Sequence, residues 1–536
     1  MTNTLAGTGG LVRLILRRDR FLLPLWVLVL GLLPVQTAVA IDQFYDTPAK
    51  LQDLYGTIAT TPGLRALLGP VFGASLGAIT VWRAGLYFTI VALASLLTVV
   101  RHTRSDEEAG RRELLGSTVV GRHAPLAAAL LVTCAADLAL GALLAAGMVG
   151  VGLPATGSLA YGASMAAAGW TFAAVGAVAA QLAQGAGAAR GIALATLGVA
   201  FALRAAGDTG GPGSGFGWLS WLSPIGWAQQ ARAYAGERWW VFALPLALVV
   251  VLVAAAFALQ ARRDVGAGVL PARLGPAEGA PGLRSPLALA WRLHRVALVS
   301  WTAGLALGGA LIGSVATSVG DMANDSPQLK DVLERLGGAK ALSDAYISGA
   351  MVIFALAAAG YAIQATLRLR SEEESGRAEP VLATAVSRLR WAGSHLLFGL
   401  LGPAVALAAA GLAEGLAYGL SSGDVGGELP KVLGGALVQL PAVLVLSGTA
   451  MALFGLLPRL APAAWAALAV SAFLVLIGPL LRLSHWLLDL APFSHVPKVP
   501  GASVSAAPLA WLLATAAVLA AAGLAGFRRR DVVSTA

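Results

Sequence analysis

The stretch Arg104-Ser-Asp-Glu-Glu-Ala-Gly-Arg-Arg-Glu-Leu-Leu-Gly-Ser-Thr-Val-Val-Gly-Arg122 decides how the chain is divided, because it occurs twice. The second copy, Arg370-Ser-Glu-Glu-Glu-Ser-Gly-Arg-Ala-Glu-Pro-Val-Leu-Ala-Thr-Ala-Val-Ser-Arg388, aligns with the first without a gap. The offset of 266 positions is close to half of the 536 residues. Agreement of this quality in a polar segment indicates an internal duplication.

Composition places the chain in a membrane. Hydrophobic residues make up 57% of the sequence and charged residues only 12%, whereas soluble chains of this length split into domains with far more polar surface. Apolar runs of about 20 residues recur, each long enough to cross about 30 Å of hydrocarbon. A β-barrel would show shorter alternating segments instead. We therefore predict an all-α polytopic membrane protein.

The apolar runs predict about twelve transmembrane helices, six in each half. In the first half they lie at about 21–41, 78–100, 124–150, 159–182, 191–206 and 241–260. In the second half they lie at about 296–317, 347–367, 392–420, 432–457, 462–481 and 506–527. Polar segments at about 42–77 and 318–346 follow the first span of each half.

The duplication also predicts the domain boundaries. Residues 1–260 form the first half and 286–536 the second, joined by a flexible cytoplasmic linker at 261–285 that is rich in Gly and Pro. Ser285 and Pro286 suit the start of a helix, with Ser as N-cap and Pro in the first turn. Two shorter motifs also occur in both halves: Leu222-Ser-Pro-Ile matches Leu490-Ala-Pro-Phe, and Arg262-Arg-Asp-Val matches Arg529-Arg-Asp-Val. Because six spans is an even number, both halves have the same orientation, and we expect a pseudo-twofold axis along the membrane normal.

Charge predicts the topology. The net charge is +10, and most of the 37 lysines and arginines face the cytoplasm if both termini lie there. The abundance of arginine over lysine is typical of a GC-rich bacterial genome, so we expect a multi-pass protein of a bacterial plasma membrane. The lipid bilayer accounts for the basic balance, and we expect no nucleic-acid partner. The single cysteine, Cys134, excludes a disulfide within the chain.

Basic residues before the first span predict an interfacial helix. They share one helical face, as in helices that lie along the inner membrane surface. These residues are Arg13, Arg17 and Arg20, and their counterparts before the seventh span are Arg292 and Arg295.

Motifs for covalent chemistry are absent from the sequence. It contains no Gly-x-x-x-x-Gly-Lys-Ser/Thr, no His-Glu-x-x-His and no Gly-x-Ser-x-Gly. We therefore expect no catalytic residues, no metal site and no directly bound cofactor.

The repeated segment resembles the membrane subunit of ABC-2 type exporters. In that family a Glu-Glu-x-Gly-Arg-x-Glu stretch between the second and third spans of each six-span unit forms a short coupling helix, which docks on an ATP-binding subunit. Over nearly its whole length the chain is similar to fused twelve-span actinobacterial permeases of the kind associated with tetronasin and other polyether antibiotics. The resemblance implies an efflux permease that works with two copies of a separate ATPase, which would hold ATP and Mg.

The resemblance assigns the docking residues in both copies. Exposed carboxylates and arginines suit docking because they set orientation and register, and the glycine permits a tight turn. A solvated loop with caps and ion pairs is the alternative interpretation. The second copy departs at Pro380, where the first has Leu114. The docking residues are Arg104, Glu107, Glu108, Gly110, Arg111 and Glu113, and Arg370, Glu373, Glu374, Gly376, Arg377 and Glu379.

Few polar residues fall within the spans. Asp137 lies in the middle of the third span, where an unpaired carboxylate costs several kcal/mol, so it is a candidate for the translocation pathway, with Arg83 as its expected partner. A purely structural pair between helices is the alternative. Four residues of the predicted outer segments are candidates for an outer gate, although an aromatic belt is the usual role of such tryptophans. They are Trp221, Pro224, Trp227 and Pro492.

These observations predict the permease of an ATP-driven exporter for lipophilic or amphipathic compounds such as antibiotics and drugs. The family resemblance implies a pathway between the second and fifth and the eighth and eleventh spans. The alternative is a proton-coupled secondary multidrug transporter, because twelve spans in two parallel halves also describe that class and Asp137 could carry a proton. A lipid-modifying enzyme lacks a candidate catalytic pair.

Overall fold

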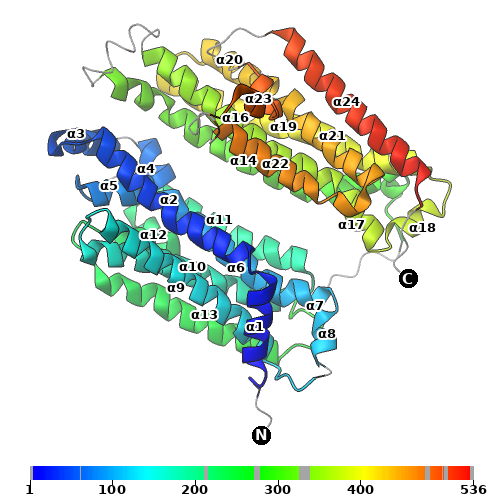
Figure 1. Cartoon of the computed structure of the whole chain (residues 1–536), viewed down its shortest axis with the longest axis horizontal. Coiled ribbons are helices and arrows are strands. Elements are labelled where there is room, and N and C mark those ends of the chain that lie inside the picture. The colour runs from blue at the N-terminus through cyan, green and yellow to red at the C-terminus, as the bar shows by residue number, and fades with distance from the viewer. Residues whose placement is uncertain are drawn as a thin grey trace. The chain divides into compact units, whose positions relative to one another are not determined.

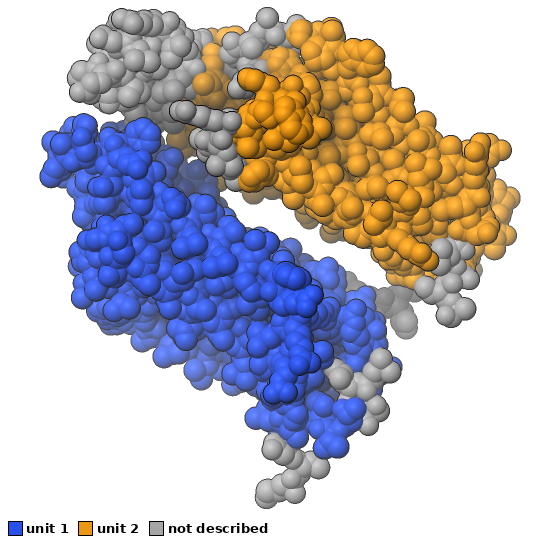
Figure 2. Space-filling model, in the orientation of Figure 1, with its two compact units in different colours: residues 1–275 blue, residues 276–536 orange. Residues whose placement is uncertain are grey.

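The chain folds into helices that belong to two compact units. The computed structural model describes residues 4–531 except 61, 117, 210–214, 271–277, 325–338, 477, 479–482, 498 and 500–504, and it contains no strand in that part of the chain. The units are Met1–Gly275 and Pro276–Ala536 (Figures 1 and 2). The division falls within the segment 261–285 that we expected as a linker.

Unit 1 begins with a short helix and continues with long antiparallel ones (Figure 1). Its first elements are α1 (Thr8–Arg18), α2 (Leu22–Phe44), α3 (Pro48–Thr60), α4 (Pro62–Leu68), α5 (Leu76–Arg83), α6 (Gly85–Val100), the π-helix η1 (Arg101–Ser105), α7 (Asp106–Glu108) and α8 (Arg111–Gly116). They are followed by α9 (Ala124–Gly150), α10 (Ala155–Leu182), α11 (Ala186–Thr209), η2 (Gly217–Leu222), α12 (Pro224–Gln230), η3 (Trp239–Phe242) and α13 (Ala243–Ala261).

Unit 2 follows a similar order of helices. Its elements are η4 (Pro281–Leu283), α14 (Pro286–Asn324), α16 (Ala339–Thr366), α17 (Arg368–Glu374), α18 (Ala378–Leu382), α19 (Arg388–Ser422), α20 (Val425–Val438), α21 (Leu440–Leu456), η5 (Pro458–Leu460), α22 (Ala463–Leu476), α23 (His485–Leu488), η6 (Pro492–His495) and α24 (Ala506–Arg529).

Eleven helical stretches among the described residues are long and apolar enough to cross a membrane. The eleventh predicted span, at 462–481, corresponds to α22, which has only 14 residues; part of that span, at 477 and 479–481, lies outside the described residues. The prediction of an all-α polytopic membrane protein is therefore confirmed.

Local sequence signals account for several helix ends. The Ser285 hydroxyl accepts a hydrogen bond from the Ala288 amide at 3.2 Å, so Ser285 caps α14 as expected. Ser387 caps α19 in the same way by accepting from the Arg390 amide at 3.3 Å. Gly423, with φ of 80°, ends α19 in the left-handed conformation that favours glycine.

Helices pack closely where glycines face each other. A methyl group at Gly141 of α9 would overlap the Gly162 carbonyl of α10, and one at Gly455 of α21 would overlap the Gly523 carbonyl of α24. Small residues let helix backbones approach in this way, which is how helices associate in lipid without a hydrophobic driving force. α10 is the central helix of unit 1, because 78% of its most apolar stretch is buried.

Two predicted spans are interrupted. The second span, expected as one helix at 78–100, is broken at Ala84 between α5 and α6. The Leu68 carbonyl packs against Gly85 at the break, in space that a side chain would fill. The tenth span is divided at Gln439 between α20 and α21, next to Pro441, which cannot donate a helical hydrogen bond.

The expected second interfacial helix is not separate. Arg292 and Arg295 are exposed on α14, which runs without a break from Pro286 into the seventh span. In unit 1, by contrast, α1 ends at Arg18 and α2 begins at Leu22. No turn-forming residue interrupts α14 at this place, so the basic residues extend the span instead of forming an element of their own.

Candidate functional site

The two repeat segments, 104–122 and 370–388, fold into the same helix–turn–helix. Each continues the helix of the preceding span, turns at a glycine and enters a second short helix: α7 and α8 in unit 1, α17 and α18 in unit 2. Gly110 and Gly376 have φ of 70° and 69°, and each amide donates to the carbonyl three residues before it at 3.0 Å. The glycine turn expected from the sequence is confirmed in both copies.

Pro380 does not disturb the second copy. It is the third residue of α18, within the first turn, where backbone amides have no helical acceptor. The helix therefore forms although the first copy has Leu114 at the matching position.

Three matched positions in each repeat segment are exposed. They carry two carboxylates and one guanidinium per copy, which are Glu108, Arg111 and Glu113 in unit 1 and Glu374, Arg377 and Glu379 in unit 2. The side chains of Glu113 and Glu379 make no hydrogen bond or ion pair with any residue that the structure describes. Glu113 and Glu379 are therefore available to a partner. The other four also bond within their own unit: Glu108 to the Ala186 amide, Arg111 to Asp106, Glu374 to Arg370 and Arg377 to Glu372.

Other residues of the repeat segments are buried, contrary to our expectation of an exposed set. Arg104 is 1% exposed, and Glu107 and Glu373 are each 6% exposed. The Glu107 carboxylate accepts two hydrogen bonds from Arg263, at 2.6 and 2.8 Å, and the Glu373 carboxylate accepts two from Arg530, both at 2.6 Å. Bidentate guanidinium contacts of this kind satisfy a carboxylate that has lost its water.

Further contacts complete the site of Glu107. Its carboxylate also accepts from the Gly266 amide at 2.7 Å and from Arg112 at 2.8 Å. Arg104 donates to the carbonyls of Ala180 and Ala267 at 3.0 and 2.8 Å. Arg370, the counterpart of Arg104, instead pairs with Glu374 at 2.6 Å, so the two copies differ at this position.

The segment after α13 is not the flexible linker that we expected, at least as far as residue 270. The amides of Val269 and Leu270 each donate to a carbonyl at the end of α10, those of Gln181 and Leu182, at 3.0 Å. Together with Arg263 and Gly266, they hold residues 263–270 against unit 1. Glycine and proline content suggested flexibility, but tertiary hydrogen bonds determine the conformation here.

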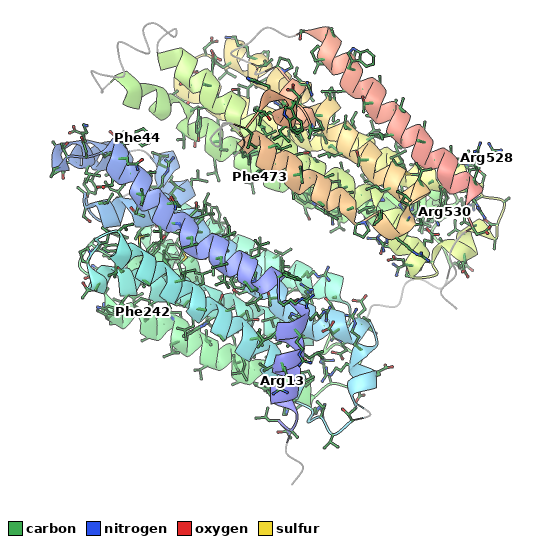
Figure 3. All side chains as sticks on the ribbon, viewed as in Figure 1. Arg13, Phe44, Phe242, Phe473, Arg528 and Arg530 are labelled. Atoms are coloured by element: carbon green, nitrogen blue, oxygen red, sulfur yellow. The ribbon has the colours of Figure 1, made fainter. Side chains whose placement is uncertain are left out.

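Helix α1 is joined to the first repeat segment through a buried carboxylate. Asp19 is 3% exposed and lies 2.6 Å from the His102 ring and 3.0 Å from Arg101, while Arg18 pairs with Asp106 at 2.7 Å. These residues come from distant parts of the sequence, and sequence reasoning missed them. Arg13, which Figure 3 labels, and Arg17 are exposed on α1, as expected, whereas the exposed Arg20 lies beyond the end of that helix at Arg18.

Asp137 is fully buried, but its partner is not Arg83. The Ser95 hydroxyl of α6 donates to the Asp137 carboxylate of α9 at 2.7 Å, and Gly169 of α10 leaves room for that carboxylate. Arg83 is exposed at the end of α5, before the break at Ala84. The break separates Arg83 from the helix that carries Ser95, so the expected pair is corrected.

The gate candidates lie in ordered turns. The Trp221 ring stacks on Trp240, with centroids 5.8 Å apart, and the Trp227 indole donates to the Trp221 carbonyl at 2.5 Å. Pro224 begins α12, and Pro492 begins η6 of unit 2. The structure thus shows a packed aromatic turn in unit 1, and the gate stays a prediction.

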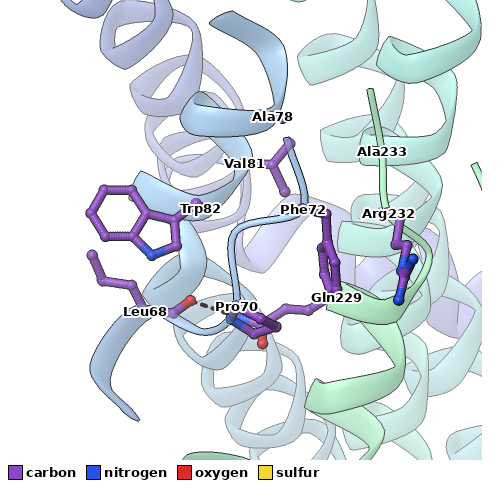
Figure 4. A pocket seen from close by; sticks show the side chains of 9 residues that line it. All are labelled: Leu68, Pro70, Phe72, Ala78, Val81, Trp82, Gln229, Arg232 and Ala233. Carbon is purple, nitrogen blue, oxygen red and sulfur yellow. Dashed lines mark hydrogen bonds between the residues drawn. The ribbon is translucent and has the colours of Figure 1, made fainter. Parts of the chain in front are cut away.

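A small hollow lies beside this turn and is lined by residues of α5, α12 and the segments next to them (Figure 4). Gln229 donates to the Leu68 carbonyl at 2.8 Å, and Arg232 lies 4.4 Å from the centre of the Phe72 ring. Arg232 and Tyr234 both have positive φ, of 53° and 62°, which non-glycine residues rarely adopt. The hollow measures about 10 Å³, enough for about one water, so it does not accommodate a drug.

Together, these features define a duplicated, multi-pass helical membrane protein with one charged helix–turn–helix at the end of a span in each unit. A family model for the multidrug efflux system permease Rv1217c, C-terminal domain, matches residues 283–528. The multidrug efflux system permease protein Rv1217c of Mycobacterium tuberculosis is 48% identical over 528 residues, covering 98% of this chain and 95% of the relative. The chain belongs to this family of multidrug efflux permeases.

Proposed function

We propose that the chain is the permease subunit of an ATP-driven ABC exporter that moves lipophilic or amphipathic compounds, including drugs, out of the cell. Two copies of a separate ATPase would dock on the two repeat segments and would hold ATP and Mg. Both termini and both repeat segments would then face the cytoplasm, in agreement with the excess of basic residues on that side.

The observation that carries this proposal is the match between the two repeat segments. Each presents two exposed carboxylates and one exposed arginine at equivalent positions beside a glycine turn. Charges at an interface set orientation and association rate, so a matched pair of such surfaces suits two identical partners. Because each segment continues the helix of a span, movement of a docked partner would be transmitted directly to that helix.

The proposed substrate class follows from the apolar surfaces of the long helices in both units. Few charged residues lie within the spans, and the described surfaces of the long helices carry many exposed leucines and valines, such as Leu28, Val199, Val250 and Leu401. Part of this surface faces lipid, and the remainder would suit an apolar cargo more than an ion.

Co-purification tests the proposal. The wild-type permease should retain the ATPase encoded beside it, and the double variant Glu113→Arg with Glu379→Arg should lose it while remaining monodisperse in detergent. The matched control reverses two exposed carboxylates at the opposite ends of the units, Asp42→Arg with Asp489→Arg, and should retain the ATPase. Failure of the wild type to bind any ATPase would refute the proposal.

A second candidate function is proton-coupled multidrug transport, favoured by the buried Asp137. Its carboxylate accepts a hydrogen bond from Ser95 and lies within a span. Intramembrane carboxylates are common proton carriers in secondary transporters. Transport that stops with an uncoupler, persists with vanadate and is abolished by Asp137→Asn would favour this function over the first.

A further inference from the structure

The ion pairs Glu107–Arg263 and Glu373–Arg530 each connect two segments of the chain that occur in both halves of the sequence. The glutamates belong to the repeat segments, and the arginines belong to the Arg-Arg-Asp-Val motifs that follow the last helix of each unit. In both units the contact is bidentate and the carboxylate is buried. Each pair therefore links two segments that lie about 156 residues apart in the sequence.

From this geometry we infer that Glu107 and Glu373 are positioning residues, which fix each repeat segment to the end of the last helix of its unit. The segment is thereby attached at two places: to the span that precedes it and, through the arginine, to α13 or α24. The exposed carboxylates of the same segments have a separate role, contact with the partner. That part of the inference rests on the proposed function, whereas the attachment itself does not.

The surroundings of the arginines support a fixed attachment. Arg530 lies 4.8 Å from the centre of the Phe454 ring and 5.1 Å from that of Phe527, and its carbonyl accepts a hydrogen bond from Arg388 at the start of α19. Arg263 is 7% exposed and also donates to Gln181 of α10 at 2.8 Å. Both guanidiniums are thus held by the ends of neighbouring helices, and Figure 3 shows Arg530 at the end of α24.

The burial of Glu107 and Glu373 distinguishes them from residues of a solvated docking surface. Bidentate pairing and burial remove both oxygens of each glutamate from a partner's reach. Breaking a buried pair by removing one charge is strongly destabilising locally, because the other charge is left unpaired. The segment should therefore open more often when the pair is broken, even without an ATPase.

Hydrogen exchange of the purified permease, without ATPase, tests the attachment. Glu373→Gln should speed exchange of the amides at 371–379 about tenfold or more, because a charge-assisted contact is lost. The exposed neighbour provides the matched control, since Glu379→Gln should leave this exchange unchanged. Glu107→Gln and Glu113→Gln form the same comparison in unit 1, so the test does not depend on one variant folding.

Swapping the two charges of the ion pair distinguishes a positioning role from a general loss of stability. Glu373→Arg and Arg530→Glu should each speed exchange, and their combination should restore it at least in part. If Glu373→Gln and Glu107→Gln leave exchange at wild-type rates, or if the combination is no slower than the single variants, the inference is wrong.

A second readout connects the attachment to the exporter. With the ATPases bound, Glu373→Gln should retain both partners but lose substrate-stimulated ATP hydrolysis, whereas Glu379→Arg should lose the ATPase that docks on the second repeat segment. If the wild type binds no ATPase, the proposed function fails, but the exchange result still decides the attachment. If Glu373→Gln retains full substrate stimulation, its role in transmitting movement is refuted.

Discussion

At the scale of single residues, a buried carboxylate is informative through what satisfies it. Asp137 and Glu107 are both buried, but Glu107 accepts hydrogen bonds from two guanidiniums and a backbone amide, whereas Asp137 accepts one from the Ser95 hydroxyl. An ion pair with full hydrogen bonding suits a fixed structural contact, and a poorly satisfied acid in a span is typical of functional positions. Substitution of Glu107 should therefore loosen a structural contact, whereas substitution of Asp137 should change a functional position.

Removing the partner of Asp137 should destabilise unit 1. Ser95→Ala removes the hydroxyl that donates to the carboxylate, and we expect a loss of about 1–3 kcal/mol in the free energy of unfolding, seen as a lower melting temperature in detergent. Ser314→Ala is the control, because the Ser314 hydroxyl is exposed and bonds only within its own helix. Equal melting temperatures for both variants would contradict the role assigned to Ser95.

At the scale of elements, the turn glycines test the repeat segments without touching any side-chain contact. No atom lies within 4 Å of a methyl group placed at Gly110 or Gly376, so a substitution there acts only through the backbone. Gly376→Ala should strain the turn by about 1–2 kcal/mol, whereas Gly376→Asn should cost less because asparagine tolerates positive φ. Hydrogen exchange across α18 measures the difference, and indistinguishable exchange in the two variants would argue against a required left-handed turn.

Helix packing can be tested with the same change at two glycines of unit 2. Gly455→Ala would press a methyl group onto the Gly523 backbone and should cost about 1–3 kcal/mol, because α21 and α24 must separate. Gly434→Ala adds the methyl group where nothing lies within 4 Å and should be neutral or stabilising. Thermal unfolding compares the two, and a Gly455→Ala protein as stable as the Gly434→Ala protein would disprove close contact between these helices.

At the scale of the whole molecule, the duplication predicts a stoichiometry. One chain has two repeat segments, so under the proposed function native mass measurement should find two ATPases on each permease. Reversing one segment alone, with Glu379→Arg, should leave a complex with one ATPase, because each segment docks its own copy. Loss of both copies from this single variant would show that the segments do not bind independently.

The sequence by itself determined the membrane class, the places of most long helices and the two glycine turns. These features depend on local properties: the length of an apolar run, the position of a cap, and a residue without a side chain where φ is positive. The same locality explains why Gly110 and Gly376 were predicted together and confirmed together. The family resemblance was likewise carried by a contiguous stretch.

Only the tertiary structure decided which charges are buried and which partner each one has. Glu107 and Glu113 look equivalent in the sequence, yet one is enclosed by Arg263 and the other is exposed, because Arg263 lies 156 residues away and reaches Glu107 only when α13 packs beside α10. The partner of Asp137 is Ser95 of α6 and not Arg83, which ends α5 on the other side of the break at Ala84. Burial is a property of the packed helices, and no local pattern specifies it.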